Sequence, residues 1–192
     1  MLRIFVPFAA LRRPLRPTLA SMRFGNTSTF AIDCVHENVP NERGWVFGRM
    51  CIWARELQLG DFEEPSCMLN VTGGHLERVM GRLQALDEPS FEDLTDSQLY
   101  ELLDRAVYRD DDRTAGQVAA DSERYFKHDF LTNGGESFDR FKSFIATANG
   151  RVRIVFAECS SGPNGVSVDM ADFVSAVTAF LGWLKQEARN VG

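Results

Sequence analysis

Residues 141–156 have the sequence FKSFIATANGRVRIVF, in which two runs rich in aromatic and β-branched side chains flank Asn149-Gly150. The Asn-Gly dipeptide favours the type I′ turn of a hairpin, because both residues accept a positive φ. A two-residue turn at this place puts Ile145 opposite Ile154, which is a favourable cross-strand pair. The stretch therefore predicts an antiparallel β-hairpin late in the chain.

A second pair of strands is predicted near the start of the chain. Residues 30–36 alternate between apolar and other side chains with a period of two, and residues 45–54 have the sequence WVFGRMCIWA. Trp45, Phe47, Cys51 and Trp53 are expected on one face of the second run, and Val46, Met50 and Ile52 on the other. Apolar side chains on both faces favour a central strand that is covered on both sides. The turn-rich segment 37–44 separates the two runs, so we expect them to pair in antiparallel fashion.

Helices are predicted between the two pairs of strands and at the end of the chain. Apolar residues spaced by three and four indicate a helix that ends near Leu86. Thr95 and Gln98 fit a capping box at the start of a second helix. Residues 109–124 contain few large apolar side chains and are expected to form a surface loop. A third helix is predicted after Asp169, with Lys185 and Arg189 near its C-terminal end.

The order of these elements predicts one α+β domain over residues 22–192. We expect a mostly antiparallel β-sheet with helices packed on one side, and a C-terminal amphipathic helix. Residues 1–21 contain three of the seven prolines and are expected to be a disordered or extraneous N-terminal extension before an effective start at Met22. An Arg-rich targeting peptide and a signal peptide are the alternatives. Arg12, Arg13 and Arg16 follow the apolar stretch instead of preceding it, which argues against a signal peptide.

The charge distribution bears on the class of partner. Residues 1–21 contain four arginines and no acid, so residues 22–192 hold 17 basic and 27 acidic side chains, a net charge of −10. A domain with this charge is repelled by the phosphate backbone of nucleic acids and attracted to a basic partner. Added solubility is the simpler explanation of the same charge. The sequence has no apolar stretch long enough for a transmembrane helix, so no membrane partner is expected.

The four cysteines are interpreted as free thiols in a reducing cytoplasm. Cys34, Cys51, Cys67 and Cys159 lie far apart and form no CxxC pair. Two disulfides would be compatible with the even number, but burial as small hydrophobic side chains is more common in a chain of this size.

A search for catalytic chemistry finds no motif. The three histidines are isolated in sequence, and none has a second ligand at metal spacing, so no metal site and no cofactor are expected. Carboxylate pairs are frequent, and any of them could form an acid/base couple. With 27 acidic residues in the chain such pairs arise by chance, and solvated surfaces explain most of them.

Several segments together resemble a known family. They are residues 24–32 (FGNTSTFAI), 44–53 (GWVFGRMCIW) and 59–62 (LGDF), followed much later by 136–139 (ESFD) before the hairpin. This set resembles the immunity protein 42 family of bacterial polymorphic toxin systems. The resemblance implies an antidote that binds a cognate toxin domain in the cytoplasm of the producing cell and blocks it. It supplies no catalytic residues and no toxin-contacting positions.

Three acidic clusters are the candidate partner-binding residues. We expect their charges to attract a basic toxin domain, because complementary charge speeds association. The competing hypotheses are a small-molecule hydrolase that uses a carboxylate pair, and an adaptor or regulatory protein with another partner. The clusters are Asp61, Glu63 and Glu64; Asp110, Asp111 and Asp112; and Glu136 and Asp139.

Overall fold

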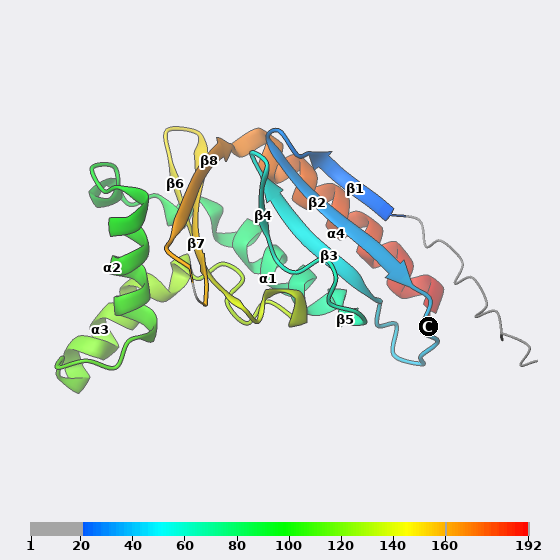
Figure 1. Ribbon diagram of the computed structural model, residues 1–192, viewed down its shortest axis with the longest axis horizontal. Helices are drawn as coiled ribbons and strands as arrows, with labels where there is room; N and C mark the ends of the chain where they lie inside the picture. The colour runs from blue at the N-terminus through cyan, green and yellow to red at the C-terminus, as the bar shows by residue number, and fades with distance from the viewer. Residues whose placement is uncertain (1–20, 160, 192) are drawn as a thin grey trace, which may run out of the picture.

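The computed structural model describes residues 21–159 and 161–191 of the chain. The predicted extension, residues 1–21, lies outside the described residues except for Ser21. Figure 1 shows two antiparallel sheets side by side, with a long C-terminal helix behind the first sheet and a pair of helices beside the second. The structure thus confirms the predicted α+β class with antiparallel strands and a C-terminal helix.

The first sheet is built from the N-terminal part of the chain. It has the strand order β1 (Ser21–Asn26), β2 (Phe30–Glu37), β3 (Phe47–Ala54) and β4 (Leu57–Leu59), and β5 (Cys67–Met68) also pairs with β3. All of these pairs are antiparallel, as predicted for β2 and β3.

The second sheet contains the predicted hairpin. β6 (Phe141–Ala148) pairs with β7 (Arg151–Glu158), and a third strand, β8 (Asn164–Asp169), pairs with β7 on its other side. Asn149 and Gly150 have φ angles of 50° and 73°, which are the positive values that the turn requires. The predicted opposition of Ile145 and Ile154 is confirmed.

Two helices cover one face of the first sheet. α1 (Leu69–Arg82) packs on β3, and α4 (Met170–Val191) packs on β1, β2 and α1. The two helices approach closely at Gly73, where a Cβ atom would lie 2.4 Å from Cδ2 of Leu184. A glycine within α1 therefore permits the contact that places both helices on the sheet.

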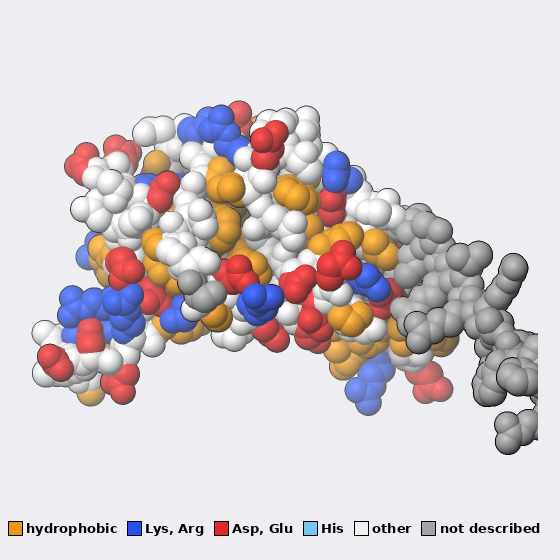
Figure 2. Space-filling view, viewed as in Figure 1, with side chains coloured by type: hydrophobic (Ala, Val, Ile, Leu, Met, Phe, Trp, Pro, Cys, Tyr) orange, Lys and Arg blue, Asp and Glu red, His pale blue; other side chains and the backbone are white. Residues whose placement is uncertain are grey.

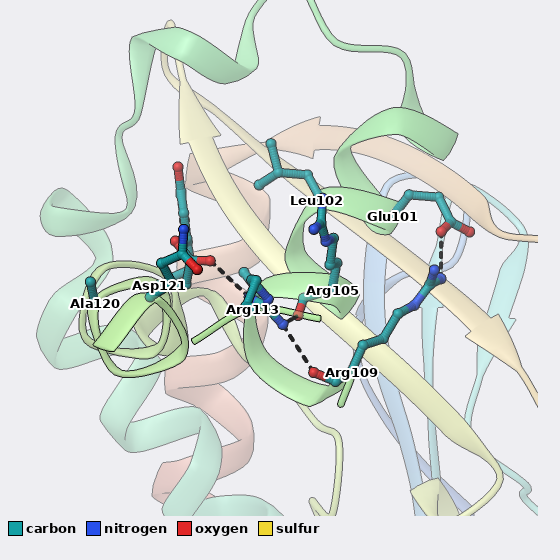
Figure 3. Close-up of a pocket in the computed structure, with 10 residues that line it drawn as sticks. Glu101, Leu102, Arg105, Arg109, Arg113, Ala120 and Asp121 are labelled. Carbon is teal, nitrogen blue, oxygen red and sulfur yellow. Dashed lines mark hydrogen bonds and ion pairs between the residues drawn. The ribbon is translucent and has the colours of Figure 1, made fainter. Parts of the chain in front are cut away.

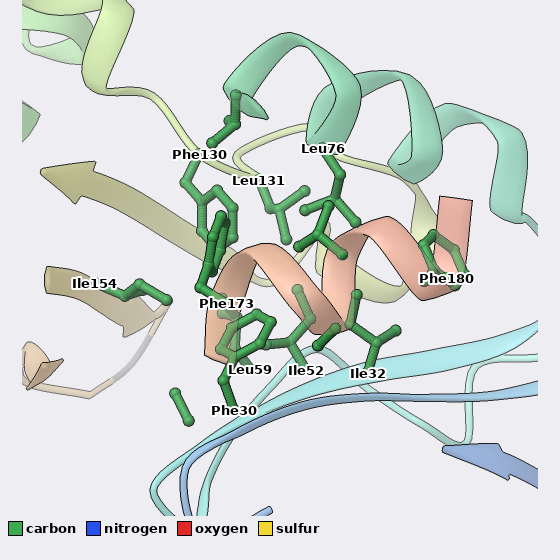
Figure 4. Packing of buried hydrophobic residues seen from close by; sticks show 14 of the residues in the cluster. Phe30, Ile32, Ile52, Leu59, Leu76, Phe130, Leu131, Ile154, Phe173 and Phe180 are labelled. Atoms are coloured by element: carbon green, nitrogen blue, oxygen red, sulfur yellow. The ribbon is translucent and has the colours of Figure 1, made fainter. Parts of the chain in front are cut away.

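The main core lies between these helices and both sheets (Figure 4). Phe30 and Ile52 from the first sheet, Phe173 from α4 and Ile154 from the second sheet are all fully or almost fully buried in it. α2 (Asp96–Tyr108) covers the opposite face of the second sheet through a smaller cluster. Helices thus lie on one side of the first sheet, while the second sheet is enclosed on both sides.

Two predictions about individual elements are wrong. Residues 109–124 do not form only a loop, because Thr114 and Gln117 make a capping box that starts the helix α3 (Ala115–Tyr125). None of the side chains of α3 is buried, which explains why the apolar pattern gave no sign of it. β3 is not covered on both faces, because both α1 and α4 pack on the same side of the first sheet.

The interpretation of the cysteines as free, buried thiols holds for three of the four. All four are free, and Cys34, Cys51 and Cys67 are buried as expected. Burial raises the pKa of the Cys34 and Cys51 thiols to about 12, so both stay protonated and unreactive at neutral pH. Cys159 is exposed, contrary to the expectation, because it lies just past the end of β7. No helix in the described part of the chain is long and apolar enough to span a membrane.

Candidate partner-binding surface

The first acidic cluster lies in the loop that connects β4 with β5. Gly60 directly follows β4 and has a φ of 100°, and a Cβ atom there would lie 2.8 Å from the ring of Phe138. Asp61 then donates its backbone N–H to the carbonyl oxygen of Ser137 over 2.7 Å. Its own carboxylate accepts the backbone N–H of Glu63 at 2.9 Å, which fixes the turn. The loop is therefore held against the segment around residue 137.

The third acidic cluster lies on this same segment, in the short 3₁₀-helix η4 (Glu136–Phe138). The carboxylate of Glu136 accepts the backbone N–H of Met68 over 3.1 Å. Asp139 follows η4 and is exposed. The fold therefore brings the first and third clusters together, although they are about seventy positions apart in sequence. We call this surface the acidic end; it consists of Asp61, Glu63, Glu64, Glu136 and Asp139.

Two arginines make ion pairs with the acidic end. A nitrogen of Arg49 lies 3.6 Å from the carboxylate of Glu63, and a nitrogen of Arg140 lies 3.9 Å from that of Asp61. Both arginines are shared with a further acid, Glu37 in the case of Arg49 and Glu158 in the case of Arg140. With Glu37 and Glu158 the surface holds seven carboxylates, four of which pair with the two arginines, so it keeps a net negative charge. Figure 2 shows acidic side chains along the middle of this face of the molecule.

Glu37 remains ionised within this group. Burial acts to raise the pKa of its carboxyl, but hydrogen bonds from Ser66 and Arg49 outweigh burial and lower the pKa below its ordinary value. A lowered pKa keeps the negative charge in place at neutral pH.

The second acidic cluster lies elsewhere. Asp110, Asp111 and Asp112 form the turn between α2 and α3, beside the second sheet, and do not join the acidic end (Figure 1). Asp111 is bonded to Arg113 and Arg105, each over 2.7 Å, and these bonds hold its pKa far below the ordinary value. Its charge is therefore neutralised within the unit formed by α2, α3 and their turn, which we call the α2–α3 arm. Asp110 and Asp112 are exposed.

A cleft of about 680 Å³ separates α2 from α3 (Figure 3). Arg105, Arg109 and Arg113 line it, but each of them is paired with an acid in the same arm. Arg113 also donates a hydrogen bond of 2.9 Å to the carbonyl oxygen of Arg109, at the C-terminal end of α2. Arg113 therefore attaches α3, through Asp121, to the end of α2, and it bonds to the carbonyl groups of Arg105 and Arg109 there.

The buried His128 and Asp129 and the partly buried His36 each have at least one structural partner. Nδ1 of His128 donates to the carbonyl oxygen of Ile145 at 2.9 Å, and His36 lies 3.3 Å from Glu187. Burial raises the pKa of Asp129, whose carboxylate accepts the hydroxyl of Tyr108 at 2.8 Å. Within residues 21–159 and 161–191, no three His, Cys, Asp or Glu side chains gather in a way that could hold a metal ion.

The sequence prediction did not identify as surface residues a row of aromatic side chains on β3 and just before it. Trp45, Phe47 and Trp53 point away from α1 and α4, are only partly buried, and belong to neither core cluster. The alternation along residues 45–54 placed them on one face correctly, but their apolar character suggested that this face is covered.

Comparisons with known proteins agree with this fold. The structure is similar to the crystal structure of CdiI from Burkholderia dolosa AUO158, with a TM-score of 0.61 and 17% sequence identity. The similar region covers 84% of this chain and 99% of that one, which indicates a common fold. A comparison with curated proteins found no match. The sequence matches the family described as immunity protein 42 over residues 22–183, so the chain belongs to the immunity protein 42 family.

Proposed function

We propose that the chain neutralises a cognate toxin by binding the toxin domain directly and covering the surface that the toxin needs. The observation that carries this function is the family match, which extends over residues 22–183 and includes both sheets and most of α4. Binding of this kind requires a rigid scaffold and a complementary surface, and it requires no catalysis by the antidote. Membership of the family does not favour the hydrolase or the adaptor hypothesis.

The charge of the acidic end supports a basic toxin as the partner. Its seven carboxylates, counting Glu37 and Glu158, exceed the two arginines that pair with them. Such a field raises the rate at which a positively charged protein is captured, and it disfavours contact with nucleic acid. We expect this steering to come from the acidic end, with a smaller contribution from Asp110 and Asp112, which lie on a separate arm.

The cytoplasm is the proposed site of action. Cys34, Cys51 and Cys67 are free thiols buried in the fold, which is typical of a protein that matures in a reducing compartment. An antidote in this compartment meets its toxin where the toxin would act on the producing cell.

A growth assay tests the proposed function. The toxin domain encoded beside this chain is induced in cells that contain either the full chain or an empty vector. We expect the full chain to restore growth and to co-purify with the toxin domain in a complex. Continued growth arrest, with both proteins present in soluble form, would contradict the function.

Paired charge-reversal variants test the part played by the acidic end. The double variant Glu64→Lys/Asp139→Lys changes two exposed acids of the acidic end, and Asp110→Lys/Asp112→Lys makes the same change on the α2–α3 turn. We expect the first to weaken protection at low antidote expression and the second to have the smaller effect. A larger loss of protection in the Asp110→Lys/Asp112→Lys variant would instead assign the electrostatic steering to the arm.

A further inference from the structure

The first sheet has one face that carries no helix. On β3 the side chains of Met50 and Ile52 point into the main core, where they pack with residues of α1 and α4. The alternate side chains belong to neither core cluster. Of these, Phe47, Arg49 and Trp53 are partly exposed, whereas Cys51 between them is buried. The three partly exposed side chains define what we call the open face of the sheet, which is turned toward the viewer in Figure 1.

The aromatic side chains of this face are partly exposed and held in place. The indole N–H of Trp53 donates to the carboxylate of Asp33 at 3.0 Å. Asp33 is held in turn by two hydrogen bonds from Arg23, of 2.6 Å and 2.7 Å. The ring of Phe47 lies 6.5 Å from that of Trp45. Aromatic side chains fixed in this way lose little conformational freedom on binding, and they often dominate the free energy of a protein interface.

The open face is continuous with the acidic end. Arg49 lies between Phe47 and Trp53 on the outward side of β3, and its side chain is bonded to Glu37 at 3.0 Å and lies 3.6 Å from Glu63. Glu63 belongs to the acidic end, so the aromatic row and the excess of carboxylates form one surface. A partly apolar centre with a polar rim is the usual composition of a specific protein interface.

We propose that the cognate toxin docks on the open face, with Phe47 and Trp53 as its anchors and the acidic end bound to lysine or arginine side chains of the toxin. The proposal rests on the proposed function and adds the surface and the chemistry of the partner. Charge complementarity selects this occupant, because the rim has too few arginines to balance its own carboxylates.

The α2–α3 arm also exposes apolar side chains. Phe126, just after α3, is 54% exposed, and Val118 on α3 is 37% exposed. The charges around them are mixed, since Glu123 is followed by Arg124 and Lys127. With mixed charges the arm favours neither a basic nor an acidic partner. A substitution on the arm therefore serves as the control in the experiment below.

The test measures association and dissociation rates by biolayer interferometry, with the full chain and the immobilised toxin domain encoded beside it. Phe47→Ala and Trp53→Ala remove the anchors, Glu64→Lys reverses a charge at the acidic end, and Phe126→Ala is the control. We expect each anchor variant to dissociate at least about tenfold faster with little change in association. Glu64→Lys is expected to slow association and to reduce its dependence on salt. Phe126→Ala is expected to bind as the unchanged chain does.

Two results would overturn the docking surface. One is tight binding that neither anchor variant nor Glu64→Lys alters. The other is weakened binding in Phe126→Ala alone, which would move the contact to the arm. Thermal unfolding checks that each variant folds. If Trp53→Ala does not fold, the two single variants Phe47→Ala and Glu64→Lys decide the outcome. A complete lack of binding by the unchanged chain is a different result, because it contradicts the proposed function itself.

Discussion

His128 is a fully buried side chain that connects the arm of α2 and α3 to the second sheet. Its ring meets the ring of Phe91 edge-on at 5.0 Å, and Nδ1 donates to the carbonyl oxygen of Ile145. Nε2 is buried without a hydrogen-bond partner among the described residues, so the neutral form of the ring suits the site and the charged form does not. Burial accordingly lowers the pKa of His128 from 6.5 to about 4.

This shift predicts a loss of stability in acid. Between pH 6.5 and 4 the unfolded chain binds a proton on His128 and the folded chain does not, so the free energy of unfolding falls as the pH is lowered through this range. The loss attributable to His128 is about 3 kcal/mol once the pH lies below 4. Urea unfolding at several pH values measures it. His128→Gln keeps a donor but does not titrate, and an equally steep pH dependence in that variant would exclude His128 as the cause.

Gly73 and Gly81 in α1 provide a second comparison at the scale of single residues. A Cβ atom at Gly73 would lie 2.4 Å from Leu184, whereas nothing lies within 4 Å of a Cβ atom at Gly81. We expect Gly73→Ala to lower the free energy of unfolding by about 1–3 kcal/mol through overpacking. Gly81→Ala should raise it by about 0.5–1 kcal/mol, because alanine favours the helix. Thermal unfolding of both variants tests the contact between α1 and α4 at Gly73. Equal changes in the stability of the two variants would show that this contact is unimportant.

At the scale of elements, α2 and α3 have the same cap but differ in burial. Thr95 and Thr114 each form a capping box with the glutamine three residues later. α2 has buried residues in the second core cluster, whereas α3 has none. Most helices in proteins gain their stability from packing, so α3 depends more heavily on its cap and on its ion pairs.

Removal of each cap separates local from global stability. Thr95→Ala is expected to lower the free energy of global unfolding by about 1 kcal/mol. Thr114→Ala should leave global unfolding nearly unchanged and speed hydrogen exchange of the α3 amides by roughly fivefold, because α3 opens locally. Equal effects of the two variants on global unfolding would show that α3 unfolds only with the whole domain.

The predictable elements are those whose signals are local. The turn at Asn149-Gly150 is specified by two neighbouring residues, and the start of α2 is specified by the four residues of the capping box that begins at Thr95. The same chemistry at Thr114 predicts α3, but the lack of large apolar residues after it suggested a loop. β8 was also missed. Val166 and Val168 alternate with smaller side chains there, but the run is short and does not indicate that it pairs with β7.

At the scale of the whole molecule, the binding surface depends on contacts that are distant in sequence. The sequence identified the acids of the acidic end, but only the packing of Gly60 on Phe138 and the bond between Met68 and Glu136 bring them together. The sequence also placed the aromatic residues of β3 on one face. Whether that face is covered depends on where α1 and α4 pack, and no local pattern contains that information.

The central claim is that this member of the immunity protein 42 family binds its toxin, with acidic side chains guiding the encounter. The most direct measurement is isothermal titration calorimetry of the full chain with the toxin domain encoded beside it, at about 50 mM and about 500 mM salt. These conditions change the Debye length from about 14 Å to about 4 Å. We predict tight one-to-one binding at the lower concentration and clearly weaker binding at the higher one. No binding at either concentration, with both proteins folded, would contradict the claim.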